Sequence, residues 1–428
     1  MNTFNLFDEI FENLQISNKE EIKNRRDEIT KALNKEFRGT DSETTNRLMV
    51  GSWGRHTAID GVSDLDLLYI LPSCLYSEYH KLGGTSKVLS RAKRGIAVHY
   101  SQTDIRVDRL VIVVNFNNYK FEVQPVFEQE DGSFLYPDTY SDSWKITKPR
   151  DEIEAISNLD DISSGNARKI CKLARAWKNK HDVIMGGLLI DTMAWRFLQN
   201  NEKYLNTTNR PDYMMCDFFK FLSDLPNQES WNALGSNQRV KVKKSFQSKA
   251  KEAYSLCCEA IDESDENKAN KKWRAVFGKF VPLSKYERLT NPLYSSYDDT
   301  EQFIENFYPV DLQYEIVLEC KVTQNGFRSA NLSQMIKNHV WLRPSKNLEF
   351  YISSTDVPAP YIVKWKVRNC GMEAEKRNCI RGQIVDGNSN YTRNEHTDFQ
   401  GEHYVECYAI RYGVVVAKGV ISVPITTS

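Results

Sequence analysis

Hydrophobic positions recur with a helical period in two parts of the chain. Residues 3–14 place three phenylalanines and an isoleucine on one stripe, which predicts a short amphipathic helix. The pattern of residues 151–308 is again mainly helical. One clear stripe there consists of Ile170, Leu173, Ala174 and Trp177. These patterns predict one short helix near the start of the chain and a largely helical middle.

From about residue 310 the hydrophobic period changes to two. Runs such as LQYEIVLECKV, YIVKWKVRNC and VVVAKGVISVPI are rich in β-branched and aromatic residues and are separated by polar turns. Short alternating runs of this kind are typical of antiparallel sheets that pack face to face. We therefore expect an antiparallel β-sandwich over residues 310–428.

The stretch from Gly51 to Pro72 carries the strongest candidate chemistry and reads GSWGRHTAIDGVSDLDLLYILP. Asp64 and Asp66 open an apolar run, and alternate residues of a strand face the same side. Two carboxylates held side by side repel each other unless a positive charge lies between them. Mg²⁺ is typically bound by one or two carboxylates plus substrate phosphates. The pair therefore predicts a divalent-metal site, with Mg²⁺ as the expected ion and Mn²⁺ as a possible substitute.

A third carboxylate lies in a predicted pair of strands. Residues 105–127 alternate as strands do, with a turn at Asn117-Asn118. Glu122 alternates there with Phe121 and Val123, and beside the strand of Asp64 and Asp66 it would complete a three-acid metal site. An exposed strand glutamate is the alternative.

Two further features could bind phosphate. Gly51 lets backbone N–H groups approach a ligand closely, and Ser52 adds a hydroxyl donor. Lys172 and Arg175 are three residues apart in the predicted helix and so share a face. On the residues alone, ordinary solvated charges on a helix surface are the alternative for this second pair.

Length and composition set broad limits. At 428 residues the chain is long enough for two domains. Its 57 basic and 57 acidic residues cancel, so a bulk electrostatic grip on DNA is not indicated. The start of the chain has no basic-then-apolar signal sequence, and no apolar run approaches membrane-spanning length. The nine cysteines show no C-x-x-C pair, which favours reduced thiols in a cytoplasmic protein.

The run GSWGRHTAI…SDLDL resembles the GS-F/W-GR-T-I…SDIDL signature of DNA polymerase β-like nucleotidyltransferases. Within them it resembles the cGAS/DncV-like group (CD-NTases), relatives of oligoadenylate synthase. The resemblance implies an α+β fold: a mixed sheet with a helical lobe, then the antiparallel C-terminal domain. It implies a catalytic lobe at residues 1–150, a helical lobe at 151–309 and a C-terminal domain at 310–428.

The resemblance also implies an activity. A metal-dependent nucleotidyltransferase would join NTPs, ATP among them, into a cyclic or short linear oligonucleotide second messenger. An effector protein would respond to that product in bacterial anti-phage (CBASS-type) signalling. Asp64, Asp66 and Glu122 would hold the metal ions. KICKLARAW resembles the L-I-R-L-V-K-x-W helix of oligoadenylate synthases, so Lys172 and Arg175 would hold the donor triphosphate with Gly51 and Ser52.

The C-terminal part resembles the AGS-C domain found fused to bacterial CD-NTases, in the W-K-V-R-N-x-G run from Trp365 to Gly371 and in the G-x-H-Y of 401–404. The resemblance implies a nucleotide or RNA ligand there, with candidate contacts from Trp365, Arg368, Asn369 and His403. A buried core tryptophan is the alternative for Trp365. Two other functions stay open: nucleotidyl transfer to an RNA or protein acceptor, and a non-catalytic nucleotide-binding sensor.

Overall fold

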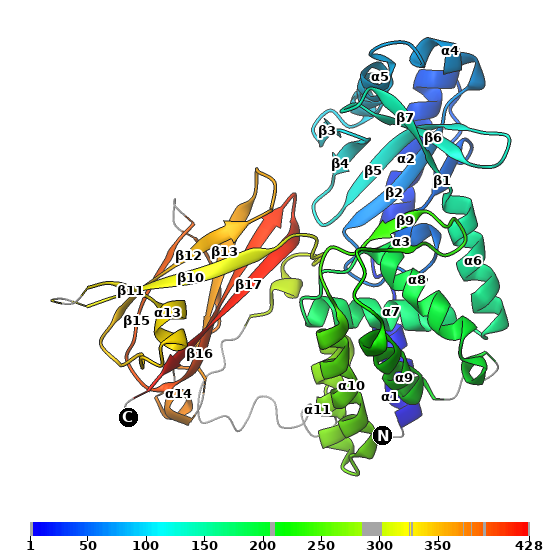
Figure 1. Cartoon of the computed structure of the whole chain (residues 1–428). Helices are drawn as coiled ribbons and strands as arrows, with labels where there is room; N and C mark the ends of the chain where they lie inside the picture. Colours follow the sequence, from blue (N-terminus) through cyan, green and yellow to red (C-terminus); the bar gives the residue numbers. More distant parts are fainter. Residues whose placement is uncertain are drawn as a thin grey trace. The chain divides into compact units, whose positions relative to one another are not determined.

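The computed structural model describes residues 3–205, 210–284, 302–324, 326, 328–370, 372–377, 379–387 and 391–426. The chain divides into two compact units, Met1–Ser284 and Lys285–Ser428 (Figure 1). The first unit contains a mixed sheet and a helical lobe, and the second contains two antiparallel sheets. This confirms the expected α+β class.

The mixed sheet of the first unit has the strand order β1-β2-β5-β4-β3, with β6 paired to β5 and β7 to β6. The strands are β1 (Arg47–Met49), β2 (Asp64–Ile70), β3 (Asp104–Asp108), β4 (Val111–Asn115), β5 (Lys120–Glu128), β6 (Phe134–Asp138) and β7 (Ser143–Thr147). Strands β2 and β5 are parallel, and the other pairs are antiparallel. The turn predicted at Asn117-Asn118 does join two strands, β4 and β5.

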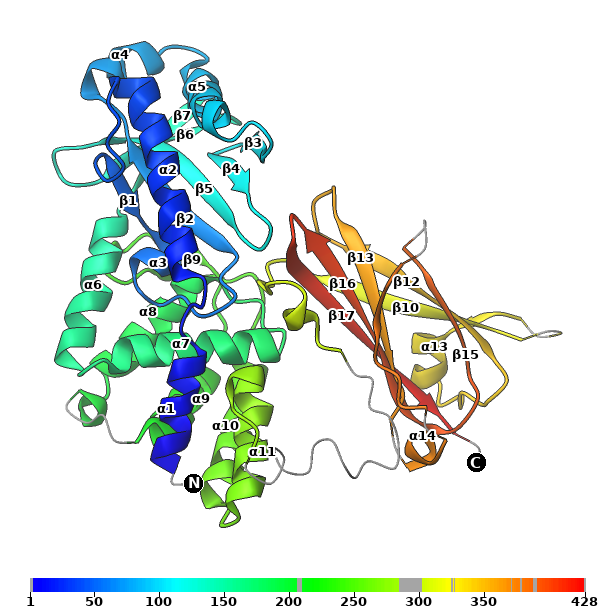
Figure 2. The same cartoon turned by 180° about the vertical axis from the view of Figure 1, so that it is seen from behind.

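Two helices, α2 (Lys19–Arg38) and α5 (Gly84–His99), cover one face of this sheet, as Figure 2 shows for α2. Leu65, Leu67 and Tyr69 of β2 are buried against these helices, as are Phe121 and Val123 of β5. Because strand side chains alternate, the residues between them lie on the opposite face of the sheet. That opposite face therefore carries Asp64, Asp66 and Glu122. Between β2 and α5 the chain forms the short helices η1 (Ser73–Leu75) and α4 (Tyr76–Tyr79).

The helical lobe packs around a separate apolar cluster. Its helices are α6 (Pro149–Ile162), α7 (Asn166–Lys180), α8 (Gly187–Gln199), η2 (Glu202–Tyr204), α9 (Pro211–Asp224), α10 (Gln247–Asp262), α11 (Glu266–Phe277) and η3 (Gly278–Phe280), with a small ribbon of β8 (Ser230–Asn232) and β9 (Arg239–Lys241). The first helix, α1 (Thr3–Asn13), buries Phe7 and Ile10 in this same cluster. The start of the chain thus packs with the helical lobe and not with the sheet.

The second unit contains the sheets β11-β10-β12-β15 and β14-β13-β16-β17, all of whose pairs are antiparallel. The strands are β10 (Ile316–Thr323), β11 (Ala330–Asn331), β12 (Asn347–Thr355), β13 (Ile362–Arg368), β14 (Ile384–Asp386), β15 (Arg393–His396), β16 (Gly401–Arg411) and β17 (Val414–Ile425); the helices are η4 (Ile304–Asn306), α13 (Leu332–Lys337) and α14 (Met372–Lys376). One core joins Cys320 and Phe350 of the first sheet with Trp365 and Cys407 of the second. The predicted antiparallel sandwich is confirmed.

Candidate active site

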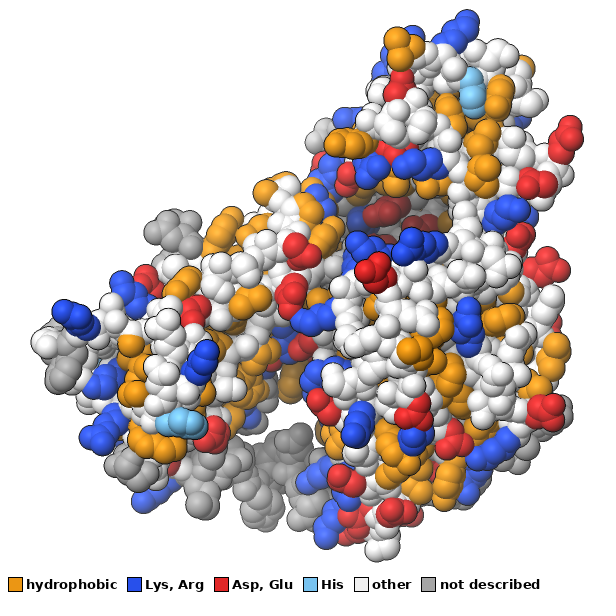
Figure 3. All heavy atoms as spheres, in the orientation of Figure 1, with side chains coloured by type: hydrophobic (Ala, Val, Ile, Leu, Met, Phe, Trp, Pro, Cys, Tyr) orange, Lys and Arg blue, Asp and Glu red, His pale blue; other side chains and the backbone are white. Residues whose placement is uncertain are grey.

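Three acidic side chains and one lysine share the face of the sheet that points away from α2 and α5. The parallel register of β2 and β5 places Asp66 opposite Glu122 and Asp64 opposite Lys120. Asp64 and Glu122 are 20% and 29% exposed, so both remain open to a ligand. Figure 3 shows acidic side chains at the bottom of a hollow in the region of β2 and β5, with basic side chains at its rim.

Lys120 lies between two of these acids. Its Nζ is 3.3 Å from Asp64 Oδ1 and 2.6 Å from Glu122 Oε1. Burial opposes the charge on Lys120, but the carboxylates of Asp64 and Glu122 outweigh it and raise the lysine pKa. Sequence reasoning missed this residue, although a lysine two positions before Glu122 on a strand must share its face. The sequence pattern predicted a metal ion as the positive charge between the acids. In the structure the ammonium of Lys120 supplies that charge.

The carboxylates nevertheless suit a divalent cation by their chemistry. Carboxylate oxygens are the ligands that Mg²⁺ prefers, and three of them line one face of two adjacent strands. In the part of the chain that the structure describes, no three His, Cys, Asp or Glu side chains are already arranged as a metal-ligand group. The donor set fits Mg²⁺ in kind, and Lys120 would have to move for a metal ion to contact both Asp64 and Glu122.

The Gly-Ser turn forms a four-residue helix, α3 (Gly51–Gly54), beside Asp66. Gly51 has φ +61°, and a Cβ atom there would lie 1.9 Å from Asp66 Oδ2. The backbone N–H of Val50 donates to the carbonyl of Asp66 at 3.0 Å. Only glycine permits this approach, so the turn is held against the carboxylate strand as the sequence predicts. The Ser52 carbonyl accepts from the N–H groups of Thr57 and Ala58, which closes the following loop.

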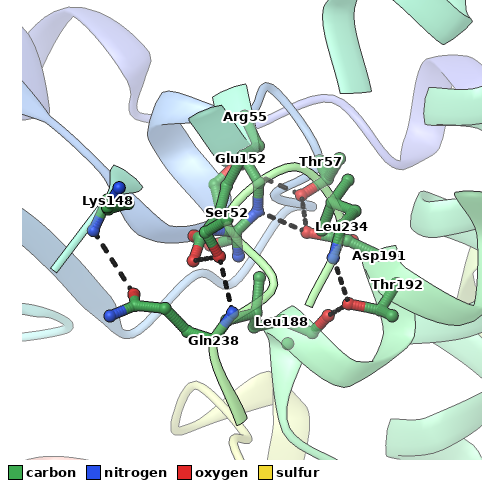
Figure 4. A network of polar contacts seen from close by, with 12 residues as sticks. Ser52, Arg55, Thr57, Lys148, Glu152, Leu188, Asp191, Thr192, Leu234 and Gln238 are labelled. Atoms are coloured by element: carbon green, nitrogen blue, oxygen red, sulfur yellow. Dashed lines mark hydrogen bonds and ion pairs between the residues drawn. The ribbon is translucent and has the colours of Figure 1, made fainter. Parts of the chain in front are cut away.

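A buried ion-pair network fixes this turn to the helical lobe (Figure 4). Asp191 of α8 is fully buried and accepts from Arg55 Nε at 2.7 Å and from Thr57 Oγ1 at 2.9 Å. Arg55 also donates to Glu152 of α6 at 3.2 Å. Arg175 completes the network, because its Nη1 lies 2.6 Å from Asp191 Oδ1.

These contacts shift the pKa values of both acids. Burial disfavours the charged form of Asp191, but the charges of Arg175 and Arg55 prevail and hold its pKa well below its usual range. Burial raises the pKa of Glu152, and Arg55 only partly offsets the rise. Asp191 is therefore the ionised centre of the network.

The structure separates the two basic residues that the resemblance assigned to the donor triphosphate. Arg175 is buried in the network with Asp191 and also donates to the carbonyl oxygens of Cys171 and Gly187. Lys172 lines a pocket with Arg168 and Lys169, and neither Gly51, Ser52 nor the three acids line it. The shared helix face predicted from their spacing breaks down because Arg175 turns into the lobe to pair with Asp191.

The candidate ligand residues of the C-terminal unit have structural roles. Trp365 is fully buried in the sandwich core, as the alternative interpretation expected. His403 is also buried; its Nδ1 accepts from the N–H of Cys370 at 3.1 Å. Arg368 and Asn369 donate to the carbonyl oxygens of Arg381 and Cys379. These contacts exclude Trp365 as a stacking surface and give the other three side chains protein partners.

No helix in the described residues is long and apolar enough to cross a membrane.

Comparison with known proteins finds a domain family that matches part of each unit. Residues 1–159 match the model of the Second Messenger Oligonucleotide or Dinucleotide Synthetase (SMODS) domain. Residues 298–426 match that of the Adenylyl/Guanylyl and SMODS C-terminal sensor (AGS-C) domain. A cyclic AMP-AMP-AMP synthase of Acinetobacter sp. is 24% identical over 263 residues, which are 56% of this chain and 74% of that protein.

Solved structures give more distant similarities. CdnC of E. coli MS115-1, in its HORMA-deltaN complex, has a TM-score of 0.48 at 14% identity, over 64% of this chain and 96% of that one. DncV cyclic AMP-GMP synthase of Vibrio cholerae, with a linear intermediate, has a TM-score of 0.46 at 13% identity, over 55% of this chain and 69% of that one.

The two domain matches follow one another in the order that the sequence resemblance implies, a synthetase domain and then a sensor domain. The chain therefore carries a SMODS second-messenger synthetase domain at residues 1–159 and an AGS-C sensor domain at residues 298–426.

Proposed function

We propose that this protein joins NTPs into a cyclic or short linear oligonucleotide second messenger and releases pyrophosphate. The observation that carries the proposal is the placement of Asp64, Asp66 and Glu122 on one sheet face, with Gly51 packed against Asp66. The match to a second-messenger synthetase domain supports the same activity. The named product of the Acinetobacter relative favours ATP among the substrates.

The turn of α3 would hold the donor nucleotide. The Ser52 hydroxyl and the first N–H groups of the turn would donate to the β- and γ-phosphates, because both lie beside the carboxylate strand. Arg175 would act through Asp191 and Arg55, which fix the loop that follows the turn, and would not touch phosphate itself. Positioning of this kind lets donors face the phosphates without reorganising during the reaction.

Asp64, Asp66 and Glu122 would hold Mg²⁺ or, in its place, Mn²⁺. When bound, the metal ions would neutralise charge on the triphosphate and lower the pKa of the acceptor hydroxyl. Lys120 would leave its position between Asp64 and Glu122 as the cation enters, and its ammonium would then be available to the α-phosphate.

The proposed step is an in-line displacement. The acceptor ribose hydroxyl oxygen forms a bond to the α-phosphorus, and the bond from that phosphorus to pyrophosphate breaks. The Glu122 carboxylate, the acid on β5, would accept the hydroxyl proton. A second round of the same step within one bound chain would close a ring.

The product would be read by a separate effector protein in bacterial anti-phage signalling, as the CD-NTase relationship suggests. The AGS-C unit would respond to a nucleotide or RNA ligand, in line with its description as a sensor domain. Contacts of that ligand would have to come from side chains other than Trp365.

The test is direct product analysis. The full chain is incubated with the four NTPs and Mg²⁺ or Mn²⁺, treated with phosphatase, and the products are identified by mass spectrometry. A phosphatase-resistant oligonucleotide that is lost in Asp66→Asn and kept in Asp108→Asn is expected, since Asp108 is an exposed acid of β3 in the same sheet. Transfer of label from NTP to an added RNA or to protein, with no small product, would contradict the proposal.

A further inference from the structure

A second cavity of about 730 Å³ lies in the first unit, between α1, the loop after α3 and the first turns of α7 (Figure 2 shows these helices). Gly51, Ser52 and the three acids do not line it. Its volume is in the range of pockets that bind small molecules. The cavity is therefore large enough for a ligand of its own, apart from the carboxylate face.

The charge in this cavity is mostly positive. Four basic side chains line it, against the carboxylates of Asp8 and Glu12 from α1: Lys19, Arg168, Lys169 and Lys172. Arg168 pairs with Asp160 at 2.9 Å. Within the described residues, none of the three lysines has a carboxylate at ion-pair distance, and they come from two separate helices.

The surroundings of the cavity disfavour the charged form of Lys172. Burial lowers the pKa of Lys172, and the nearby charge of Arg168 lowers it further. The pKa of His56, on the loop after α3, is lowered in the same way. Burial is the largest cause, and the charges of Arg168, Lys19 and Lys172 follow. An anion in the cavity would relieve this repulsion, because opposite charges at close range favour the charged forms.

Two aromatic rings complete the wall. Trp53 is half-buried at the edge of the cavity, and Phe11 lies under the ammonium of Lys169, with 5.5 Å from Nζ to the ring centroid. Aromatic faces next to basic side chains are the usual means of holding a base together with its phosphates.

We propose that this cavity is a second ligand site, which takes a nucleoside triphosphate with its base at Trp53 and Phe11 and its phosphates at Lys19, Lys169 and Lys172. The ligand would contact the same turn that carries the catalytic glycine and serine, because Trp53 belongs to α3. Arg168 also connects the cavity to the loop after α3, since its Nε donates to the carbonyl oxygen of Arg55 at 3.2 Å. The site does not depend on the proposed catalytic function, since its ligand is held without metal ions.

The test is isothermal titration of the full chain with ATP in EDTA, so that any ATP bound at the carboxylate face lacks divalent cations. The test variant is Lys19→Glu/Lys169→Glu, and Lys35→Glu on the same helix as Lys19 is the matched control. Each lost charge-assisted contact is expected to weaken ATP binding about tenfold or more. Inorganic triphosphate should bind more weakly than ATP, because it has no base to stack.

A neutral Lys19→Gln/Lys169→Gln variant guards against misfolding from charge reversal, and it must weaken ATP binding in the same direction. ATP bound at the carboxylate face or in the AGS-C unit is unaffected by these two lysines, so the difference between variants reports this cavity alone. Equal ATP affinity in wild type, the double variants and Lys35→Glu would overturn the proposal. Absence of any ATP binding by the wild type at millimolar concentration would overturn it too.

Discussion

Lys120 Nζ lies 2.6 Å from Oε1 of Glu122, on the strand face where the proposed activity requires a divalent cation. The lysine and the metal would compete for the same carboxylates. Lys120→Met removes the competing charge, so we expect tighter Mn²⁺ binding, by roughly tenfold for one removed ion pair at short range. The measurement is a titration of Mn²⁺ by electron paramagnetic resonance.

Lys87→Met, which removes an exposed lysine from α5, is the control and should leave Mn²⁺ affinity unchanged. Unchanged or weaker binding in Lys120→Met would mean that the lysine does not occupy the cation position. We also expect Lys120→Met to turn over more slowly than wild type although it binds Mn²⁺ more tightly. The reason is that the variant lacks the ammonium that would contact the α-phosphate once the metal ion is bound.

Asp66 provides the simplest test of the carboxylate face. It lies opposite Glu122 in the sheet and directly against Gly51, so Asp66→Asn keeps the shape and removes one negative charge. We expect product formation to fall by about three orders of magnitude or more, as for a lost charge at a reacting centre. The free energy of unfolding, measured by urea denaturation, should change by less than about 1 kcal/mol. A variant with near wild-type turnover would remove Asp66 from the site.

Gly51 and Gly61 allow a matched comparison of two alanine variants. Both have positive φ, +61° and +81°, but a Cβ at Gly51 would lie 1.9 Å from Asp66 Oδ2 while nothing lies within 4 Å at Gly61. Alanine should cost about 1 kcal/mol of stability at either position through backbone strain. Only Gly51→Ala should also displace Asp66 and abolish product formation. Equal activity of the two alanine variants would show that the close approach is not needed.

Much of this arrangement follows from the sequence through local rules. The alternation of Asp64 and Asp66 and the break at Gly51 fix side-chain direction and turn geometry within a few residues. The C-terminal sandwich was also predicted from local patterns, since period-two alternation is strong over its long strands. The pairing of β2 with β5, which places Asp66 opposite Glu122, was only the condition on which the three-acid hypothesis depended. Alternation shows that each segment is a strand, but it does not show which strands pair.

Long-range polar contacts could not be read from the sequence. The spacing of Lys172 and Arg175 places both on one helix face, but it does not reveal that Asp191, in another helix, draws Arg175 inward. Similarly, α1 precedes the sheet in sequence and yet buries Phe7 among the helices that follow it. Lys120 follows from the same alternation rule as Glu122, since both lie on one face of β5, but a lysine is not a metal ligand and so did not belong to the predicted acid set.

Asp191 gives the last prediction, because it is a fully buried carboxylate that compensates two arginines. Asp191→Asn leaves the charges of Arg55 and Arg175 without their shared partner, which should cost about 3–5 kcal/mol of unfolding free energy. Asp224→Asn breaks an exposed pair with Lys220 and should cost less than about 1 kcal/mol. The pKa of Asp191 is lowered in the folded state, so its contribution is fully present above the unfolded value of about 3.9 and is lost as the pH falls below it. The difference in urea stability between wild type and Asp191→Asn should therefore be constant from about pH 7 to pH 5 and shrink at lower pH. A difference that grows on acidification would contradict an ionised Asp191, and with it the network that holds the loop after α3.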